Sequence, residues 1–171
     1  MPYFNIVAQS NESTVVTEYK PQEKRSEAYQ SEAALEQEFI SMLTKQGYEY
    51  LAIHDEKALI SNLRRQLELL NSFTFSENEW NRFFTECIAG KNDGIAEKTR
   101  RIHDDHIQIL HCDNGTTKNI YLLDKKNIHN NRLQVINQYT VTDGTHDNRY
   151  DVTVLVNGLP LVHIELKRRG V

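Results

Sequence analysis

The spacing of apolar residues changes along the chain near residue 104. Between residues 31 and 103 they recur every three or four positions, which is the period of a helix that buries one face. From residue 104 to 171 apolar and polar residues alternate in short runs, which is typical of strands. Helices followed by strands predict an α/β (α+β) unit, in which helices pack on a sheet.

Four helices are predicted, at residues 32–46, 56–71, 76–89 and 95–102. Residues that favour the start or the end of a helix support these assignments. Ser31 suits the N-cap of the first helix and Gly47 suits its end, while Ser76 and Glu79 have the spacing of a capping box for the third. The stripe of the first helix expected to face the core consists of Leu35, Phe39, Met42 and Leu43.

The strands are expected mainly in the last third of the chain. They are predicted at residues 11–19, 105–112, 118–126 and 132–142, and in a final hairpin over 149–167. The polar stretch 20–27 is predicted to be a loop. We therefore expect a single domain over residues 1–171, with a strand and loop in 1–30, mainly helices in 31–103 and mainly strands in 104–171.

Composition excludes several protein classes. No apolar run reaches the roughly 18 residues that a membrane span needs, and the first residues lack the basic and apolar regions of a signal peptide. We therefore expect a cytoplasmic protein without a membrane partner. The two cysteines, Cys87 and Cys112, are expected to be free thiols.

Charge is unevenly distributed. Residues 1–117 carry 12 Lys and Arg against 19 Asp and Glu, whereas residues 118–171 carry 8 against 5. The basic C-terminal third is compatible with a polyanionic ligand, and equally with an ordinary solvated surface.

The final hairpin carries charges at positions where a strand needs none. Alternation predicts that Asp151 faces away from Val152, and that Glu165 and Lys167 share one face. A simple two-residue turn at Asn157-Gly158 would put the two acids on opposite faces of the sheet. A three-residue bulged turn with Gly158 in the left-handed position, or a loop of Asn157, Gly158 and Leu159, would put them on the same face. We predict such an odd or bulged connection, and a clean two-residue hairpin would argue against an active site here.

Two carboxylates on one face form an oxygen-rich site that suits Mg²⁺. A lysine two residues after the second acid can hold a water molecule or stabilise charge on a phosphate, so the pattern favours phosphodiester hydrolysis. The other interpretation is a solvent-exposed ion pair, which is common in strands. For His163, packing or a neutral hydrogen bond is favoured over contact with DNA.

A rival metal cluster would use the histidines and the cysteine between residues 103 and 112. In a strand His106 and Cys112 share one face, while His103 and His111 share the other, so the four cannot converge without a bend. We expect these to be surface and edge-strand residues. No GxxxxGK[ST] loop occurs, so no nucleotide site is expected within these residues.

The segment RYDVTVLVNGLPLVHIELKRRG resembles the PD-(D/E)xK motif in the N-terminal nuclease domain of the restriction (R) subunit of type I restriction-modification enzymes. The similarity continues upstream through NQYTV, LLDKKN, NDGIAEKTRRIH and YQSEAALEQEFISMLTKQGYEY, so it covers most of the chain. It implies a restriction-endonuclease-like core, in which a mixed sheet is flanked by helices.

The resemblance also implies roles for particular residues. Asp151 and Glu165 would ligate Mg²⁺, the carbonyl of Leu166 is a candidate further ligand, and Lys167 would assist the water. The acid that related nucleases supply from the first helix corresponds to Glu36, with Glu32 as the weaker candidate. Tyr150 stands where the family often has proline, a change that affects backbone shape rather than chemistry.

The chain stops four residues after Lys167, before the helix that follows in the family. The resemblance therefore implies an N-terminal fragment of a larger subunit, which would bind ATP, translocate double-stranded DNA and assemble with modification and specificity subunits. Two alternatives remain at this stage. They are a noncatalytic docking module and a repair or recombination nuclease of the same fold.

Overall fold

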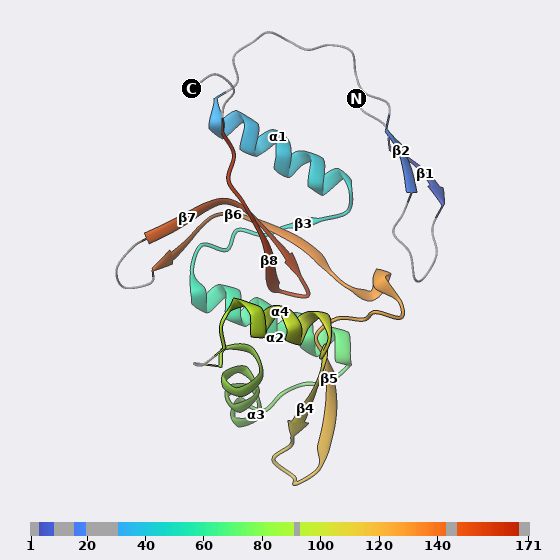
Figure 1. Ribbon diagram of the computed structural model, residues 1–171, viewed down its shortest axis with the longest axis vertical. Coiled ribbons are helices and arrows are strands. Elements are labelled where there is room, and N and C mark those ends of the chain that lie inside the picture. Colours follow the sequence, from blue (N-terminus) through green and yellow to red (C-terminus); the bar gives the residue numbers. More distant parts are fainter. Residues whose placement is uncertain (1–3, 9–15, 20–30, 91–92, 143–146, 168–171) are drawn as a thin grey trace.

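The computed structural model describes residues 4–8, 16–19, 31–90, 93–142 and 147–167, and their main body forms two lobes (Figure 1). One lobe holds helix α1 (Glu32–Lys45) and a sheet. The elements of the other lobe are α2 (Glu56–Asn71), α3 (Glu77–Phe83), α4 (Ile95–His103), β4 (Ile107–His111) and β5 (Thr117–Tyr121). All four predicted helices are therefore present.

A four-stranded sheet forms the centre of the molecule. Its strands, in spatial order, are β3 (Glu49–Tyr50), β6 (Leu133–Thr142), β7 (Asp147–Val156) and β8 (Leu159–Ile164). β3 runs parallel to β6, whereas the β6–β7 and β7–β8 pairs are antiparallel. The sheet is therefore mixed and flanked by helices, which confirms the predicted fold class.

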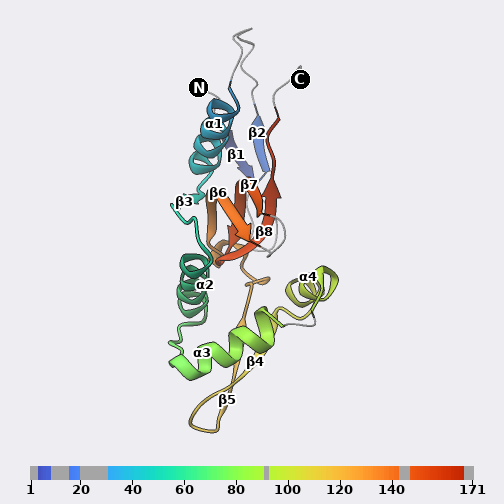
Figure 2. The ribbon, with the colours of Figure 1, turned by 90° about the vertical axis from the view of Figure 1, so that its left-hand side faces the viewer.

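Each face of this sheet is covered by a different helix. On one face Ile40 of α1 packs against Val135 and Val152. On the other face Leu59 of α2 packs against a cluster that contains Ile136 and Leu155. From the side the molecule is elongated, with the sheet between α1 and α2 (Figure 2). Strand alternation therefore supplies two separate hydrophobic cores.

The buried face of α1 differs from the predicted stripe. Ser31 caps the helix through the backbone N–H of Ala34, as expected. Phe39 and Leu43 of that stripe pack against the core as predicted, but Met42 is 37% exposed and the most deeply buried residues of α1 are Glu36 and Ile40. A buried carboxylate breaks the apolar pattern from which the stripe was predicted, because Glu36 has polar partners on the sheet.

The strands outside the central sheet form two separate hairpins. β4 pairs with β5 only, so the predicted strands at 105–112 and 118–126 do not extend the central sheet. β1 (Phe4–Ala8), which was not predicted, pairs with β2 (Val16–Tyr19) inside the predicted strand 11–19. The predicted loop at 20–27 lies outside the described residues.

The second lobe has its own aromatic core. Phe75, Trp80 and Phe83 pack with Leu63 and Leu67 of α2, and Leu159 joins them from β8. The predicted third helix continues past α3 as one π-helical segment, Phe84–Ile88, because its last residues form wider turns. Among the described residues, no helix combines the length and the apolar character needed to cross a bilayer.

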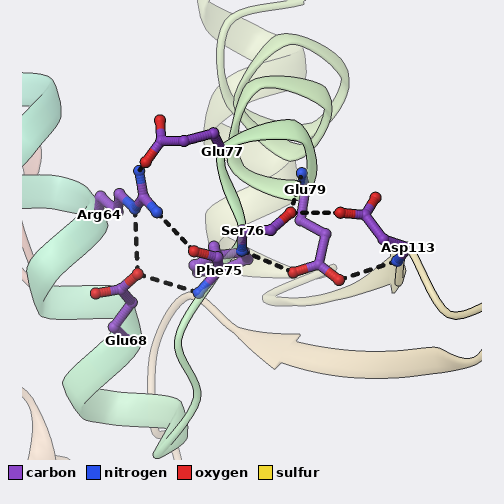
Figure 3. Close-up of polar contacts among 7 residues, drawn as sticks. All are labelled: Arg64, Glu68, Phe75, Ser76, Glu77, Glu79 and Asp113. Carbon is purple, nitrogen blue, oxygen red and sulfur yellow. Dashed lines mark hydrogen bonds and ion pairs between the residues drawn. The ribbon is translucent and has the colours of Figure 1, made fainter.

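A polar network fixes the start of α3 against its neighbours (Figure 3). The predicted capping box is present, because Ser76 Oγ accepts from Glu79 N at 3.1 Å and Glu79 Oε2 accepts from Ser76 N at 2.9 Å. The second Glu79 oxygen accepts from the backbone N–H of Asp113 at 3.0 Å. One carboxylate therefore joins α3 to the loop between β4 and β5.

Candidate active site

The turn of the final hairpin has two residues. Asn157 and Gly158 have φ values of 50° and 81°, and Val156 pairs with Leu159 across them. Positive φ at both positions is the geometry of a type I′ turn, for which Asn-Gly is the favoured sequence. The turn itself is therefore not of odd length.

A bulge one step further along β8 restores the register that the site requires. Leu155 pairs with Pro160 but Val154 pairs with Val162, so Leu161 is an extra residue without a partner in β7. The prediction of an odd-length or bulged turn is therefore wrong, and the one-residue shift comes from a bulge inside β8 instead. Alternation alone could not locate it, because any residue between the turn and Glu165 could have been the extra one.

With this bulge, Asp151 and Glu165 become the next residues after the last pair of the two strands, Val152 with Ile164. Asp151 Oδ2 accepts a hydrogen bond from the backbone N–H of Leu166 at 2.7 Å. The first carboxylate therefore holds the chain segment that carries the second, together with the Leu166 carbonyl.

Glu165 and Lys167 form an exposed ion pair beyond the end of β8. Lys167 Nζ lies 2.6 Å from Glu165 Oε1, and the two side chains are 74% and 66% exposed. The Glu165 carboxylate raises the pKa of Lys167, and the charges of Glu32 and Asp151 add to this effect. Lys167 is therefore a cation over the whole neutral range.

Asp151 opens into a cleft of about 390 Å³ at the N-terminal end of α1. The residues that line it are Glu32, Ala33, Glu36, Gln138, Arg149 and Asp151. Val152 packs against α1, and Asp151 lines a cleft with residues of α1. The two neighbouring side chains therefore lie on the same face of the sheet, so the predicted alternation is wrong at Asp151. The reason lies in β6, where Gln138, opposite Asp151, has a φ of 53° and breaks the regular pairing.

Glu36 shares this cleft with Asp151, but its carboxylate is already engaged. It is 7% exposed, Asn137 Nδ2 donates to Oε1 at 2.6 Å, and Gln138 Nε2 donates to Oε2. The structure therefore brings Glu36 next to Asp151 as predicted from the first helix, and it gives each oxygen an amide partner. Glu32 lines the same cleft one turn earlier.

The donor types suit a hard cation, although the described side chains do not form a complete cage. Across the described ranges, no group of three His, Cys, Asp or Glu residues is arranged to hold a metal ion. Mg²⁺ commonly uses one or two carboxylates and completes its shell with water and substrate oxygens. Asp151, Glu165 and the Leu166 carbonyl fit that requirement. In the histidine and cysteine segment, His103 Nδ1 lies 2.7 Å from Asp104 Oδ1.

His163 packs beside the site rather than inside the cleft. Its ring stacks on Tyr150 with centroids 4.0 Å apart, and its Nδ1 lies 2.9 Å from Thr153 Oγ1. Loss of water around the ring lowers the pKa of His163, so it is neutral at neutral pH. This matches the expected packing and hydrogen-bonding role.

Two residues that line the cleft, Gln138 and Arg149, were not anticipated. Nor was the burial of Asn157 in the hairpin turn, at the far end of β7. Asn157 Nδ2 donates to the carbonyl of Leu122 at 3.0 Å, and its Oδ1 accepts from Arg132 N at 2.8 Å. The Asn-Gly turn signal was visible in the sequence, but these partners were not.

Comparison with known proteins places the chain in a family. The family model described as "Type I restriction enzyme R protein N terminus" matches residues 29–171. The chain belongs to this family. It is 51% identical over 166 residues to the type I restriction enzyme EcoprrI endonuclease subunit of Escherichia coli, covering 96% of this chain and 53% of that protein.

Further relatives of this type I restriction family are longer. The chain is 42% identical over 149 residues to a type I restriction enzyme endonuclease subunit of Staphylococcus aureus, covering 84% of this chain and 15% of that protein. A Staphylococcus saprophyticus endonuclease subunit is 41% identical over 148 residues, with the same two shares. The chain thus spans about half, or much less, of the curated relatives that it matches.

Proposed function

We propose that this chain is the nuclease domain of a type I restriction subunit, and that it hydrolyses phosphodiester bonds of double-stranded DNA with Mg²⁺. The observation that carries the proposal is the hydrogen bond from Leu166 N–H to Asp151 Oδ2, because it ties the segment that carries Glu165 and Lys167 to an acid of the cleft. Membership of the restriction family and the endonuclease names of the relatives support it.

Within this proposal the two carboxylates and one carbonyl have distinct roles. Asp151, Glu165 and the Leu166 carbonyl would hold Mg²⁺, whose charge polarises a phosphoryl oxygen and lowers the pKa of water. Lys167 lies 2.6 Å from Glu165, so its ammonium can orient a water molecule or stabilise charge on the phosphate. Holding metal would require Glu165 to exchange its lysine partner for the cation.

Glu36 has a supporting role in this proposal. Its two oxygens accept from Asn137 and Gln138, so it holds the β6 backbone opposite Asp151. Its buried negative charge adds to the cation-attracting potential of the cleft. A water molecule between Glu36 and a bound cation would complete the link without breaking either amide contact.

For the whole protein, we propose a longer cytoplasmic restriction subunit. In it, residues 1–171 would form one nuclease domain, and ATP-dependent translocation would deliver the DNA. Modification and specificity subunits would supply the recognition sequence, so this domain needs little base readout of its own. The greater length of the relatives supports this arrangement.

One observation favours a second candidate, a noncatalytic docking module. Glu36 is satisfied by two amides and Glu165 by Lys167, so the acids already have partners without a metal. No observation favours a repair or recombination nuclease, because the chain belongs to the restriction family.

Mn²⁺ binding measured by calorimetry separates these candidates. The nuclease proposal expects one site that is lost in both Asp151→Ala and Glu165→Ala and kept in the control Glu97→Ala, an exposed acid on α4. Binding that survives both changes, or no binding by the unaltered chain, would support the docking module and overturn the proposal.

A further inference from the structure

Gln138 has an unusual backbone conformation inside a strand. Its neighbours Asn137 and Tyr139 pair normally with Val152 and Tyr150, yet Gln138 itself has a φ of 53°. The left-handed region is common for glycine and asparagine but uncommon for a side chain such as glutamine. Such conformations persist where the surrounding contacts impose them, and they gather at functional sites.

This conformation changes where the side chains of β6 point. In a regular strand neighbouring residues face opposite sides of the sheet. Here Asn137 and Gln138 both donate hydrogen bonds to Glu36 of α1. Tyr139 then packs with Ile136 and Leu155 on the α2 face. The irregular residue therefore places the Gln138 amide in the cleft, beside the buried amide of Asn137.

The Gln138 amide joins two charged groups across the cleft. Its Nε2 donates to Glu36, and its Oε1 accepts from Nε of Arg149. Arg149 is exposed and lies two residues before Asp151 on the same strand. An amide is suited to this position, because it has one donor and one acceptor end and cannot bond both groups in any other orientation.

Arg149 is the one cation among the six residues that line the cleft. The contact with Gln138 uses its Nε–H, while a guanidinium carries four further N–H donors on its two Nη atoms. Those donors form a planar fork that matches two oxygens of a phosphate. An anchored arginine beside acidic metal ligands therefore suits a substrate that brings its own negative charge.

We propose that Arg149 binds a backbone phosphate of the DNA beside the bond that is cleaved, and that Gln138 is the positioning residue that holds the Arg149 guanidinium there. This inference rests on the proposed nuclease function, because it needs DNA in the cleft. Arg149 would also offset the repulsion between the DNA and the three acids of the cleft.

The first test is DNA binding by Arg149→Ala. The probe is a short fluorescent double-stranded oligonucleotide, measured by anisotropy with Ca²⁺ over a series of salt concentrations. Affinity should fall about tenfold, and the slope of log K against log salt should decrease by about 0.9, the value for one lost phosphate contact. Arg65→Ala, which removes an exposed arginine of α2, is the control and should change neither quantity.

The second test separates positioning from folding. Asparagine adopts left-handed φ values readily, so Gln138→Asn keeps the backbone but shortens the amide beyond reach of both partners. It should melt at or above the wild-type temperature and still bind DNA several-fold more weakly. In the double variant with Arg149→Ala, the change at Gln138 should add nothing, because its effect acts through Arg149. Additive losses would overturn the positioning role.

Mn²⁺ calorimetry on the same variants distinguishes the two proposals. Arg149→Ala should bind Mn²⁺ at least as tightly as wild type, because it removes a positive charge from the cleft. If the wild type binds metal and cleaves DNA while Arg149→Ala binds DNA normally, this inference fails and the nuclease function stands. If the wild type binds no metal, both fail. If it binds metal but no DNA at low salt, the Arg149 inference fails.

Discussion

The molecule contains two polar networks that use similar residues for different ends. The cap network, at the start of α3, consists of Arg64, Glu68, Phe75, Ser76, Glu77, Glu79 and Asp113 (Figure 3). The cleft network, at the start of α1, consists of Glu36, Asn137, Gln138, Arg149 and Asp151. Both contain a nearly buried glutamate at 7% exposure, Glu79 in one and Glu36 in the other.

The two buried glutamates differ in what they hold. Glu79 accepts from backbone N–H groups of Ser76 and Asp113, so it satisfies donors that would otherwise be orphaned at a helix start and a loop. Glu36 accepts from the side-chain amides of Asn137 and Gln138 in the sheet, and Gln138 has a left-handed backbone. The cap network therefore stabilises the fold. The cleft network instead arranges charged and amide groups around a cleft, and it includes a residue with an unfavourable backbone conformation, Gln138.

The largest expected effect separates activity from stability at the cleft. Asp151→Asn keeps the shape of the side chain and an oxygen for the Leu166 N–H, so its free energy of unfolding should change by less than about 1 kcal/mol. Cleavage should fall at least about a hundredfold, because the proposed Mg²⁺ ligand loses its charge. Denaturant melts and a plasmid cleavage assay measure the two quantities. A large loss of stability with normal cleavage would reverse the assignment of the two networks.

A second change tests the contact that joins the hairpin to the scaffold. A Cβ on Gly158 would lie 2.6 Å from the Cα of Leu63 in α2, and φ is 81° there, so Gly158→Ala should cost about 3 kcal/mol. Gly115 is the matched control, because its φ is 82° but nothing lies within 4 Å. Gly115→Ala should cost about 1 kcal/mol. Equal losses of unfolding free energy for the two variants in urea melts would show that the positive φ causes the whole effect and that the contact with Leu63 contributes nothing.

Replacing a carboxylate by an amide should lower the free energy of unfolding in the cap network more than in the cleft, where the corresponding change is Asp151→Asn. Both oxygens of Glu79 accept from backbone N–H groups. In Glu79→Gln an NH₂ group replaces one oxygen, so one of those backbone N–H groups loses its acceptor and faces another donor. We expect a loss of about 2 kcal/mol in urea unfolding. Mn²⁺ binding at a temperature where the protein is folded should be normal. Glu86→Gln, an exposed change on the π-helical segment, should leave both measurements unchanged.

The smallest effect concerns acid pH. The hydrogen bond from Ser76 and the nearby Arg82 hold the pKa of Asp113 below its ordinary value. The unfolded chain then takes up the proton at higher pH than the folded chain, so this stabilisation is present above the ordinary pKa and is lost as pH falls through the folded value. Urea midpoints measured from about pH 5 to about pH 3 should fall more for wild type than for Asp113→Asn. Parallel curves would contradict this.

Sequence reasoning succeeded where neighbouring residues decide the structure. The helix over residues 56–71 and the Ser76–Glu79 capping box are present as predicted. The need for a bulge in the hairpin followed from counting residues between two acids that had to share a face. Its position at Leu161 did not follow, because alternation is equally consistent with an extra residue elsewhere. The predicted orientation of Asp151 was wrong for a different reason, because the left-handed Gln138 opposite it interrupts the alternation.

By itself the sequence determined the helix ends and the Asn-Gly turn, because these depend on residues within a few positions of one another. Only the tertiary structure decided that Glu36 is buried and meets Asn137, which lies 101 residues away. That contact forms because α1 and α2 cover opposite faces of one sheet and fix its register. The left-handed Gln138 and the anchored Arg149 depend on the same packing, since no local preference of glutamine produces them.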